Sequence, residues 1–341
     1  MAQVVSRLGS QRHAARRLPL IAADIGGTYA RLGLVSRDEG AGASIALMPF
    51  KTYRCTEYPS LAAIFRDFLA GLGGVPVRHC AIASAGFAVN GTVIHANLPW
   101  PVAAGELQQE LQFDDVSLIN DFAAIAYGAP YVDSRDITVL SPGTPLAAQG
   151  PQVLLGPGTG LGAAVLLANG GDGHRVLATE AGQAAFSPTT DLEIEILQLL
   201  RKRFDHVSNE RVVSGPGLLN LYTALATLRG AVRKQCTPED VTAAAVAGSD
   251  PTAREAFELF CGITGSVAGD LVLLYGAHGG VYVAGGILPR LKDFVLASSF
   301  MSRFTDKGAM RTLLEQVPVK LIEHGNLGVL GAARWYLEGR D

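Results

Sequence analysis

The sequence predicts an α/β protein of about two domains. At about 150 residues per domain, its 341 residues suggest roughly two such units. Each half opens with a strand, a glycine turn and a second strand, with DIGGT at 24–28 and GPGTGLG at 156–162. Strand–helix alternation follows the first cluster of strands, and this order is typical of the α/β class.

The first half contains five apolar runs that predict strands: 20–24, 31–35, 45–53, 80–85 and 116–119. Apolar residues at helical spacing predict a helix over 59–69, with Ser60 near its start. An alanine-rich helix is expected directly after Asp121, where the run 116–119 ends.

The second half alternates in the same way. Strands are predicted on both sides of the 156–162 turn and later in the chain: 153–155, 163–167, 281–284 and 317–322. The predicted helices are 191–204, with Thr190 or Asp191 as N-cap, and then 217–228, 252–275 and 327–337. The uncharged stretch 271–289 contains five glycines, so it indicates a helix end, a turn and a buried strand, not a membrane span.

The composition narrows the function classes. Apolar residues make up 48%, too many for a disordered chain. The net charge of −3 argues against a dedicated nucleic-acid binder. The four cysteines form no CxxC pair, so we expect no structural zinc or disulfide framework, but buried thiols in a cytoplasmic protein. Residues 1–17 are basic, and we expect a disordered tail, with a transit peptide as the alternative.

The two glycine turns are the first candidate functional features. Such turns expose successive N–H groups and carry no Cβ, so phosphate oxygens can approach, and Thr28 and Thr159 add hydroxyl donors. Each turn taken singly also suits an ordinary tight hairpin. The Walker A sequence, the dinucleotide fingerprint and the protein-kinase catalytic loop are absent.

The most informative acid is Asp121, which follows a buried strand at the start of a helix, where α/β proteins tend to bind ligands. There it suits either a general base for a sugar hydroxyl or a helix N-cap, and Asn120 suits the cap equally well. Other planar polar side chains suit either sugar recognition or an ordinary surface: Asn97, Asn120, Glu180, Gln183 and Glu210.

A family resemblance decides between these alternatives. Five motifs, in this order and spacing, resemble the ATP-dependent bacterial glucokinases of proteobacterial type: Asp24–Thr28 with Arg31, Leu118–Phe122, Gly156–Gly162, Glu210–Leu218 and Ala284–Ile287. The resemblance implies the two-domain actin-like ATPase (ribonuclease H-like) fold of the hexokinase superfamily, with an interdomain cleft that closes over hexose. It implies a small domain of 18–131 plus 321–341 and a large domain of 132–320.

The resemblance also implies roles for individual residues. Asp121 is the expected general base for the 6-hydroxyl of D-glucose. Glucose is expected to contact a polar set: Asn97, Asn120, Asp121, Glu180, Gln183 and Glu210. ATP is expected to contact the glycine segments and their neighbours: Asp24, Gly26, Gly27, Thr28, Arg31, Gly158, Thr159, Gly160, Gly215, Gly217, Gly285 and Gly286. Mg²⁺ is expected on ATP phosphates and waters, with no direct protein ligand and Asp24 as an outer-shell partner.

Two departures from the family pattern fall in this expected site. The usual Glu-Gly-Gly-His is here Glu180-Ala-Gly-Gln183, and the usual asparagine after Gly-Gly-Thr is here Tyr29. A glutamine still donates and accepts through its amide, but with different geometry. The alternatives to a glucokinase are therefore a kinase for another hexose and a catalytically weak sugar-sensing regulator. The resemblance further implies a cytoplasmic homodimer that acts in glycolysis without a nucleic-acid or membrane partner.

Overall fold

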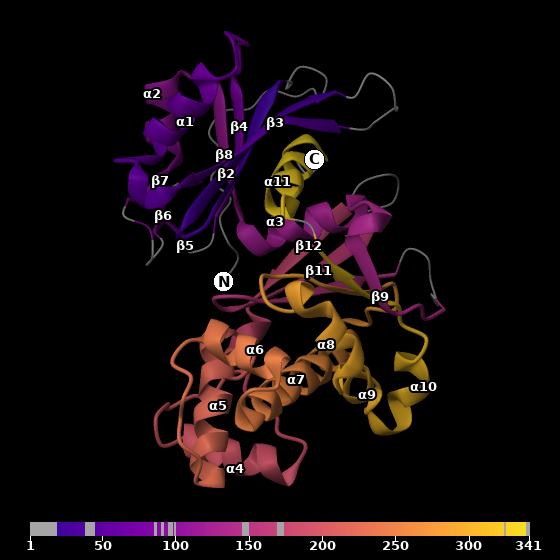
Figure 1. Cartoon of the computed structure of the whole chain (residues 1–341). Coiled ribbons are helices and arrows are strands. Elements are labelled where there is room, and N and C mark those ends of the chain that lie inside the picture. The colour runs from indigo at the N-terminus through magenta and orange to yellow at the C-terminus, as the bar shows by residue number, and fades with distance from the viewer. Residues whose placement is uncertain are drawn as a thin grey trace. The chain divides into compact units, whose positions relative to one another are not determined.

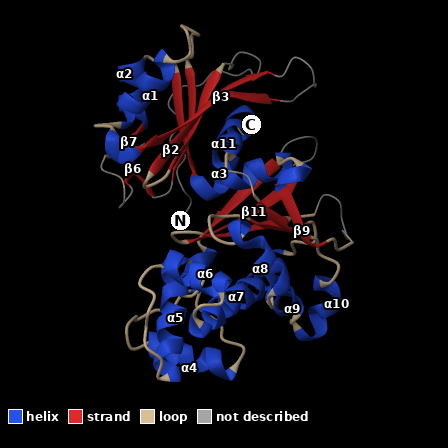
Figure 2. Cartoon of the chain, in the orientation of Figure 1, coloured by secondary structure: helices blue, strands red, loops and turns tan. Residues whose placement is uncertain are grey.

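The structure is a computed structural model that describes residues 19–37, 45–84, 87–89, 92–94, 98, 100–144, 150–168, 174–323 and 325–338. The chain divides into two compact units. Unit 1 comprises 1–132, 169–176 and 324–341, and unit 2 comprises 133–168 and 177–323. The expected tail at 1–17 lies outside the described residues. Figure 1 labels the elements along the chain, and Figure 2 separates helices from strands.

Unit 1 is built on a five-stranded sheet with the order β3-β2-β1-β4-β8. Strands β1, β4 and β8 run parallel to one another, and β2 and β3 are antiparallel to their neighbours. All five strands were predicted from apolar runs; their bounds are β1 Leu20–Ile25, β2 Tyr29–Arg37, β3 Ile45–Arg54, β4 His79–Ser84 and β8 Asp115–Asn120.

Helices cover both faces of this sheet, and the alternation of β1 shows which helices lie on which face. Ile21, Ala23 and Ile25 share a core with α1 (Leu61–Ala70) and α2 (Ala104–Leu111). Leu20 and Ala22 share the other core with α3 (Asp121–Gly128) and α11 (Leu327–Glu338). Successive strand residues point to opposite faces, so a fully apolar strand indicates a sheet buried on both sides. A small sheet of β5 (Phe87–Val89), β6 (Thr92–Ile94) and β7 (Val102–Ala103) completes the unit.

Close packing between α3 and α11 fixes the start of α3. A Cβ on Gly331 of α11 would collide with the carbonyl oxygen of Ala124 on α3, and a Cβ on Gly128 would lie 2.8 Å from the carbonyl oxygen of Leu327. The two helices therefore touch backbone to backbone. Because Asp121 is the first residue of α3, this contact also holds Asp121 in place.

The second large sheet has six strands in the order β12-β11-β10-β13-β14-β9, and all of it belongs to unit 2 except residues 174–176 of β12, which belong to unit 1. Strands β10, β13 and β14 are parallel, and β11 and β9 run antiparallel to their neighbours. The bounds are β9 Ile137–Ser141, β10 Gln152–Pro157, β11 Leu161–Ala168, β12 His174–Thr179, β13 Gly280–Val283 and β14 Val319–Ile322. The expected turn at 156–162 is shorter than predicted, because the strands pair as far as Pro157 and Leu161.

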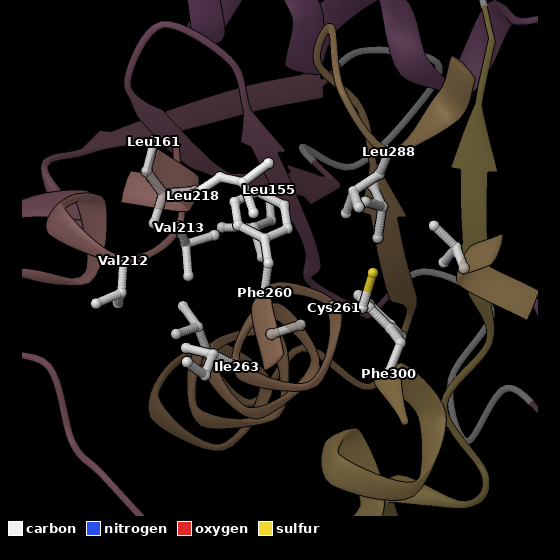
Figure 3. Close-up of a cluster of buried hydrophobic side chains, with 14 of the residues drawn as sticks. Leu155, Leu161, Val212, Val213, Leu218, Phe260, Cys261, Ile263, Leu288 and Phe300 are labelled. Atoms are coloured by element: carbon white, nitrogen blue, oxygen red, sulfur yellow. The ribbon is translucent and has the colours of Figure 1, made fainter. Parts of the chain in front are cut away.

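The helices of unit 2 are α4 Asp191–Leu200, α5 Gly215–Arg229, α6 Pro238–Ala247, α7 Pro251–Tyr275, α8 Lys292–Ala297, α9 Phe300–Thr305 and α10 Arg311–Leu314. Figure 3 shows part of the core that these helices and the sheet enclose. Helix α7 is long and apolar enough to span a membrane, but 72% of its most apolar window is buried inside the fold. That burial marks α7 as the core helix of this unit.

Two local predictions were wrong in detail. The helix expected over 191–204 ends at Leu200, because the N–H groups of Lys202 and Arg203 donate to carbonyls only three residues back, those of Leu199 and Leu200, and 201–203 form a turn. Thr190 is its N-cap, accepting the Glu193 N–H at 3.3 Å.

Of the four cysteines, Cys55, Cys80 and Cys261 are buried as expected, whereas Cys236 is exposed.

Candidate functional site

Unit 1 gathers its predicted site residues at the carboxyl ends of three parallel strands. Asp24 near the end of β1 is aligned with Ala83 of β4, and Ser84 of β4 is aligned with Asn120 at the end of β8. Asp121 follows Asn120 as the first residue of α3. Parallel strands end at the same sheet edge, so Asp24 and the Asn120–Asp121 pair belong to one cluster.

Asp24 has a strongly perturbed environment. Its side chain is 21% exposed, and its Oδ2 lies 3.3 Å from a guanidinium nitrogen of Arg31. Burial raises its pKa to about 6, the Arg31 charge opposes that rise, and the negative charge of Asp121 adds to it. Gly328 at the start of α11 contributes to this burial, because a Cβ there would lie 2.8 Å from the Asp24 Cγ.

The sequence left the N-cap of α3 open between Asn120 and Asp121. Asn120 is the N-cap of α3, and its Oδ1 accepts the N–H groups of Phe122 and Ala123, each at 3.0 Å. The capping function is therefore performed by Asn120. The half-buried carboxylate of Asp121 accepts the Phe122 N–H at 2.8 Å through Oδ1.

The first glycine turn joins β1 to β2 in the same unit. The Gly26 N–H donates to the Tyr29 carbonyl at 3.0 Å, and the Cys55 N–H donates to the Thr28 carbonyl at 2.9 Å. Gly26 and Gly27 are partly exposed and Thr28 is exposed. Tyr29, one of the departures from the family pattern, is 43% exposed. The turn thus presents small residues beside Asp24.

Unit 2 brings three separate glycine segments together. The Gly215 N–H at the start of α5 donates to the Gly158 carbonyl at 2.8 Å, and the Gly158 N–H donates to the Gly160 carbonyl at 2.8 Å. Gly285, which follows β13, has a φ of +95° and lies against the Pro157 carbonyl so closely that no Cβ fits. These contacts join the ends of β10 and β13 to the start of α5.

The predicted ATP contacts in this cluster differ in what they offer a ligand. Gly158 and Gly286 have open space where a Cβ would stand. Gly217 is buried, and its N–H donates to the N-cap Ser214 Oγ at 2.9 Å. Within the described part of the chain, the N–H groups of Thr159, Gly160 and Gly286 donate to no protein atom. The open space at Gly158 and Gly286 and these three N–H groups could accommodate a phosphate.

The predicted sugar residues of unit 2 form a second group beside the glycines. The Oε1 atom of Glu210 accepts the Gln183 Nε2–H at 3.1 Å, and its Oε2 accepts the Leu161 N–H at 2.9 Å. Glu180 is exposed and immediately precedes the short helix Ala181–Gln183. The His206 Nε2 lies 2.8 Å from the Gln183 carbonyl oxygen and links that short helix to the segment that follows α4.

Asn97 lies outside the described residues, so the structure does not place it. The described residues contain no group of three or more His, Cys, Asp or Glu side chains that would hold a metal ion. The remaining predicted site residues fall into one cluster in each unit. Those of unit 1 lie around Asp24 and Asp121, and those of unit 2 lie around Gly158 and Glu210.

Sequence reasoning missed several residues that shape these clusters, namely Leu161, Gly182, Gly328 and Gly331. Leu161 supplies a main-chain donor, for which its side chain carries no signal. The glycines permit close approach, and Gly328 and Gly331 stand three apart on one helix. That spacing places small residues on one helix face and was a readable signal.

Comparison with known proteins identifies the family. Residues 21–338 match the family model described as Glucokinase. The chain belongs to the glucokinase family. A "Glucokinase-like protein" of Xylella fastidiosa strain 9a5c is 47% identical over 93% of this chain and 94% of its own length. A "Glucokinase" of Saccharophagus degradans is 38% identical over 93% of this chain and 98% of its own length.

Solved structures agree on the architecture. A glucokinase from an Antarctic psychrotroph matches with a TM-score of 0.83 and 36% identity, covering 92% of this chain and 97% of that one. A ROK family glucokinase from Streptomyces griseus, solved in complex with glucose and AMPPNP, matches with a TM-score of 0.59 and 21% identity over 92% and 97% of the two chains. The second likeness extends the shared α/β fold to the ROK glucokinases.

Proposed function

We propose that this protein transfers the γ-phosphoryl group of ATP to the 6-hydroxyl of D-glucose, giving glucose 6-phosphate and ADP. The observation that carries the proposal is the Asp24–Asp121 cluster at the ends of β1 and β8. A half-buried carboxylate at the start of a helix, beside a second acid, suits proton removal from a hydroxyl. Family membership supports glucose as the acceptor.

Each cluster has a distinct task in this reaction. Asp121 accepts the proton of the 6-hydroxyl as that oxygen attacks the γ-phosphorus and the bond to the ADP oxygen breaks. Asn120 caps the helix and holds Asp121 at its start. Glu180, Gln183, Glu210 and, by resemblance, Asn97 bind the other hydroxyls.

The glycine segments receive the nucleotide. The N–H groups of Thr159, Gly160 and Gly286 bind phosphate oxygens, and the space beside Gly158 and Gly286 admits the ligand. The AMPPNP in the ROK family glucokinase supports a nucleoside triphosphate in this fold. Asp24, a carboxylate beside the Gly26–Thr28 turn, fits an outer-shell partner of Mg²⁺. When bound, Mg²⁺ neutralises charge on the phosphates.

The remaining parts of the proposal concern assembly and location. Units 1 and 2 serve as the small and large domains of a two-domain enzyme, with hexose bound in a cleft that closes to exclude water. The enzyme acts as a cytoplasmic homodimer without a nucleic-acid or membrane partner. Size-exclusion chromatography with light scattering measures the dimer, for which twice the chain mass is expected.

The proposal is tested by glucose 6-phosphate formation with purified protein, Mg-ATP and millimolar glucose, run beside a panel of glucosamine, mannose and fructose. Glucose is expected to give the highest kcat/KM. Preference for another sugar would support the second candidate function, a kinase for a different hexose. That candidate is motivated by Gln183, which stands where the family has histidine and bonds Glu210. Folded protein without turnover on any sugar would contradict both.

A further inference from the structure

Glu210 joins two segments to which the proposed function gives different substrates. Its Oε1 accepts from Gln183, in the short helix Ala181–Gln183 proposed for the sugar, at 3.1 Å, and its Oε2 accepts from the Leu161 N–H at 2.9 Å. Leu161 directly follows the glycine turn proposed for ATP phosphates. Both oxygens of this carboxylate are therefore hydrogen-bonded by the protein, and each keeps a lone pair for a sugar hydroxyl.

The donor on Leu161 is rigid. Leu161 is only 6% exposed and belongs to the core cluster of unit 2, of which Figure 3 also labels Leu218 and Val213. Its carbonyl oxygen lies against Gly182 so closely that a Cβ on Gly182 would collide with it. Because both ends of the residue are held, the Leu161 N–H keeps a fixed direction and orients the carboxylate that it binds.

Gly160 leaves the space that this carboxylate occupies. A Cβ on Gly160 would stand 2.5 Å from the Glu210 Oε2, closer than packed atoms allow, and 3.3 Å from the Glu210 Cδ. Gly160 is not among the glycines with a left-handed backbone, so the turn itself does not require glycine at this position. The neighbouring Gly158 differs, because a Cβ there meets nothing within 4 Å.

We propose that Gly160 and Gln183 are positioning residues for sugar binding, and that they act through Glu210. This inference rests on the proposed function and deepens it. Gly160 serves the sugar site by lacking a side chain, in addition to offering its N–H to a phosphate. Gln183, in addition to the sugar contact proposed above, fixes the second carboxylate oxygen of Glu210. Its amide stays neutral across the physiological pH range, unlike the histidine of the family pattern.

The test compares Gly160→Ala with Gly158→Ala in initial-rate kinetics over a grid of glucose and ATP concentrations. In Gly160→Ala the displaced carboxylate raises the KM for glucose roughly tenfold to a hundredfold, as expected for a lost charge-assisted hydrogen bond, and the KM for ATP changes much less. In Gly158→Ala the new methyl group enters the space proposed for the nucleotide, so the KM for ATP rises instead.

A second substitution separates displacement of Glu210 from general distortion. Glu210→Asp shortens the side chain, so Gly160→Ala combined with Glu210→Asp is expected to have a lower KM for glucose than Gly160→Ala alone. Gly105→Ala is the folding control, because Gly105 of α2 has open space at its Cβ position and lies in unit 1, away from the proposed contacts.

The results separate this inference from the proposed function. Turnover of glucose by the wild type tests the proposed function itself. With turnover intact, a rise in the KM for ATP alone, or equal rises in both KM values, would overturn the role of Gly160. If another hexose is the substrate, the same split is measured with that sugar. If no hexose is phosphorylated, the inference falls together with the proposed function.

Gln183 is tested by two substitutions of similar size. Gln183→Met removes the amide donor, and Gln183→Glu places a second carboxylate against Glu210. The KM for glucose is expected to rise in the order wild type, Met, Glu, and the Glu variant is expected to improve as the pH falls and repulsion is relieved. A Met variant with the wild-type KM would overturn the positioning role of Gln183.

Discussion

The cluster around Asp24 and Asp121 in unit 1 and the cluster around Gly158 and Glu210 in unit 2 differ in their physical character. The cluster of unit 1 concentrates charge, because Asp24, Arg31 and Asp121 meet at one sheet edge and the pKa of Asp24 rises to about 6. The cluster of unit 2 provides space and backbone donors, and its carboxylate Glu210 is hydrogen-bonded on both oxygens. In the proposed function, unit 1 supplies the reactive group Asp121, and unit 2 supplies most of the groups that bind the glucose hydroxyls and the phosphates.

The largest expected effect concerns the reactive group. Asp121→Ala removes the proposed base and is expected to lower kcat by roughly 10²–10⁴, while glucose affinity is partly retained. Steady-state kinetics with Mg-ATP measures it. Near wild-type turnover in this variant would show that Asp121 is not the general base, and the contrast between the two clusters would then lose its reactive group.

Unit 2 also contains a buried charge, but its environment indicates a structural role. The fully buried Glu193 of α4 lies 2.7 Å from the Arg303 guanidinium of α9. Arg303→Met leaves that carboxylate without its cation, so the free energy of unfolding is expected to fall by about 3–5 kcal/mol. Urea denaturation measures the loss.

A matched double variant checks the cause. Glu193→Gln combined with Arg303→Met removes both charges and is expected to recover part of the lost stability. Equal losses in the single and double variants would show that Arg303 acts through packing and not through its charge.

The contact between α3 and α11 provides a test in unit 1. Gly331→Ala inserts a methyl group against the Ala124 carbonyl, and such overpacking is expected to cost about 1–3 kcal/mol. The shift at α3 is also expected to lower kcat through Asp121. Gly105→Ala, which replaces a glycine inside α2 where a Cβ has open space, is expected to lower neither stability nor kcat. Thermal denaturation and initial rates measure the two effects. Full stability and full activity in Gly331→Ala would contradict the backbone-to-backbone contact.

The smallest expected effect tests whether Asp121 and Arg31 shift the pKa of Asp24. Its folded-state pKa lies above the unfolded value, so ionisation disfavours the fold and stability contributed by the protonated group is lost as pH rises from about 4 to about 6. Asp121→Asn removes a negative neighbour and is expected to lower this pKa, and Arg31→Met removes the cation and is expected to raise it. Carboxyl-carbon NMR titration of the ligand-free protein measures both directions, and equal pKa values in all three proteins would refute the coupling.

The sequence predicted what depends on strand order and missed what depends on contacts between distant residues. Asp121 at a strand end and the two glycine turns follow from apolar runs and turn residues near them in the chain. The pairing of Gln183 with Glu210 joins residues 27 positions apart, and no periodicity indicates it. Likewise, a Cβ at position 160 would collide with the carboxylate of Glu210, which is 50 residues away in the chain. The turn sequence by itself therefore predicted only a nucleotide contact for Gly160.

The most direct test of the account measures glucose binding and phosphoryl transfer in the same variant. Asp121→Asn, which keeps the size of the side chain, is titrated with glucose by calorimetry and then mixed with Mg-ATP under single-turnover conditions. The account predicts that glucose still binds, because Glu210 and its partners in unit 2 are intact, and that glucose 6-phosphate forms at least roughly a hundredfold more slowly. Wild-type transfer, or loss of glucose binding with the fold intact, would contradict the division between a reactive cluster and a recognition cluster.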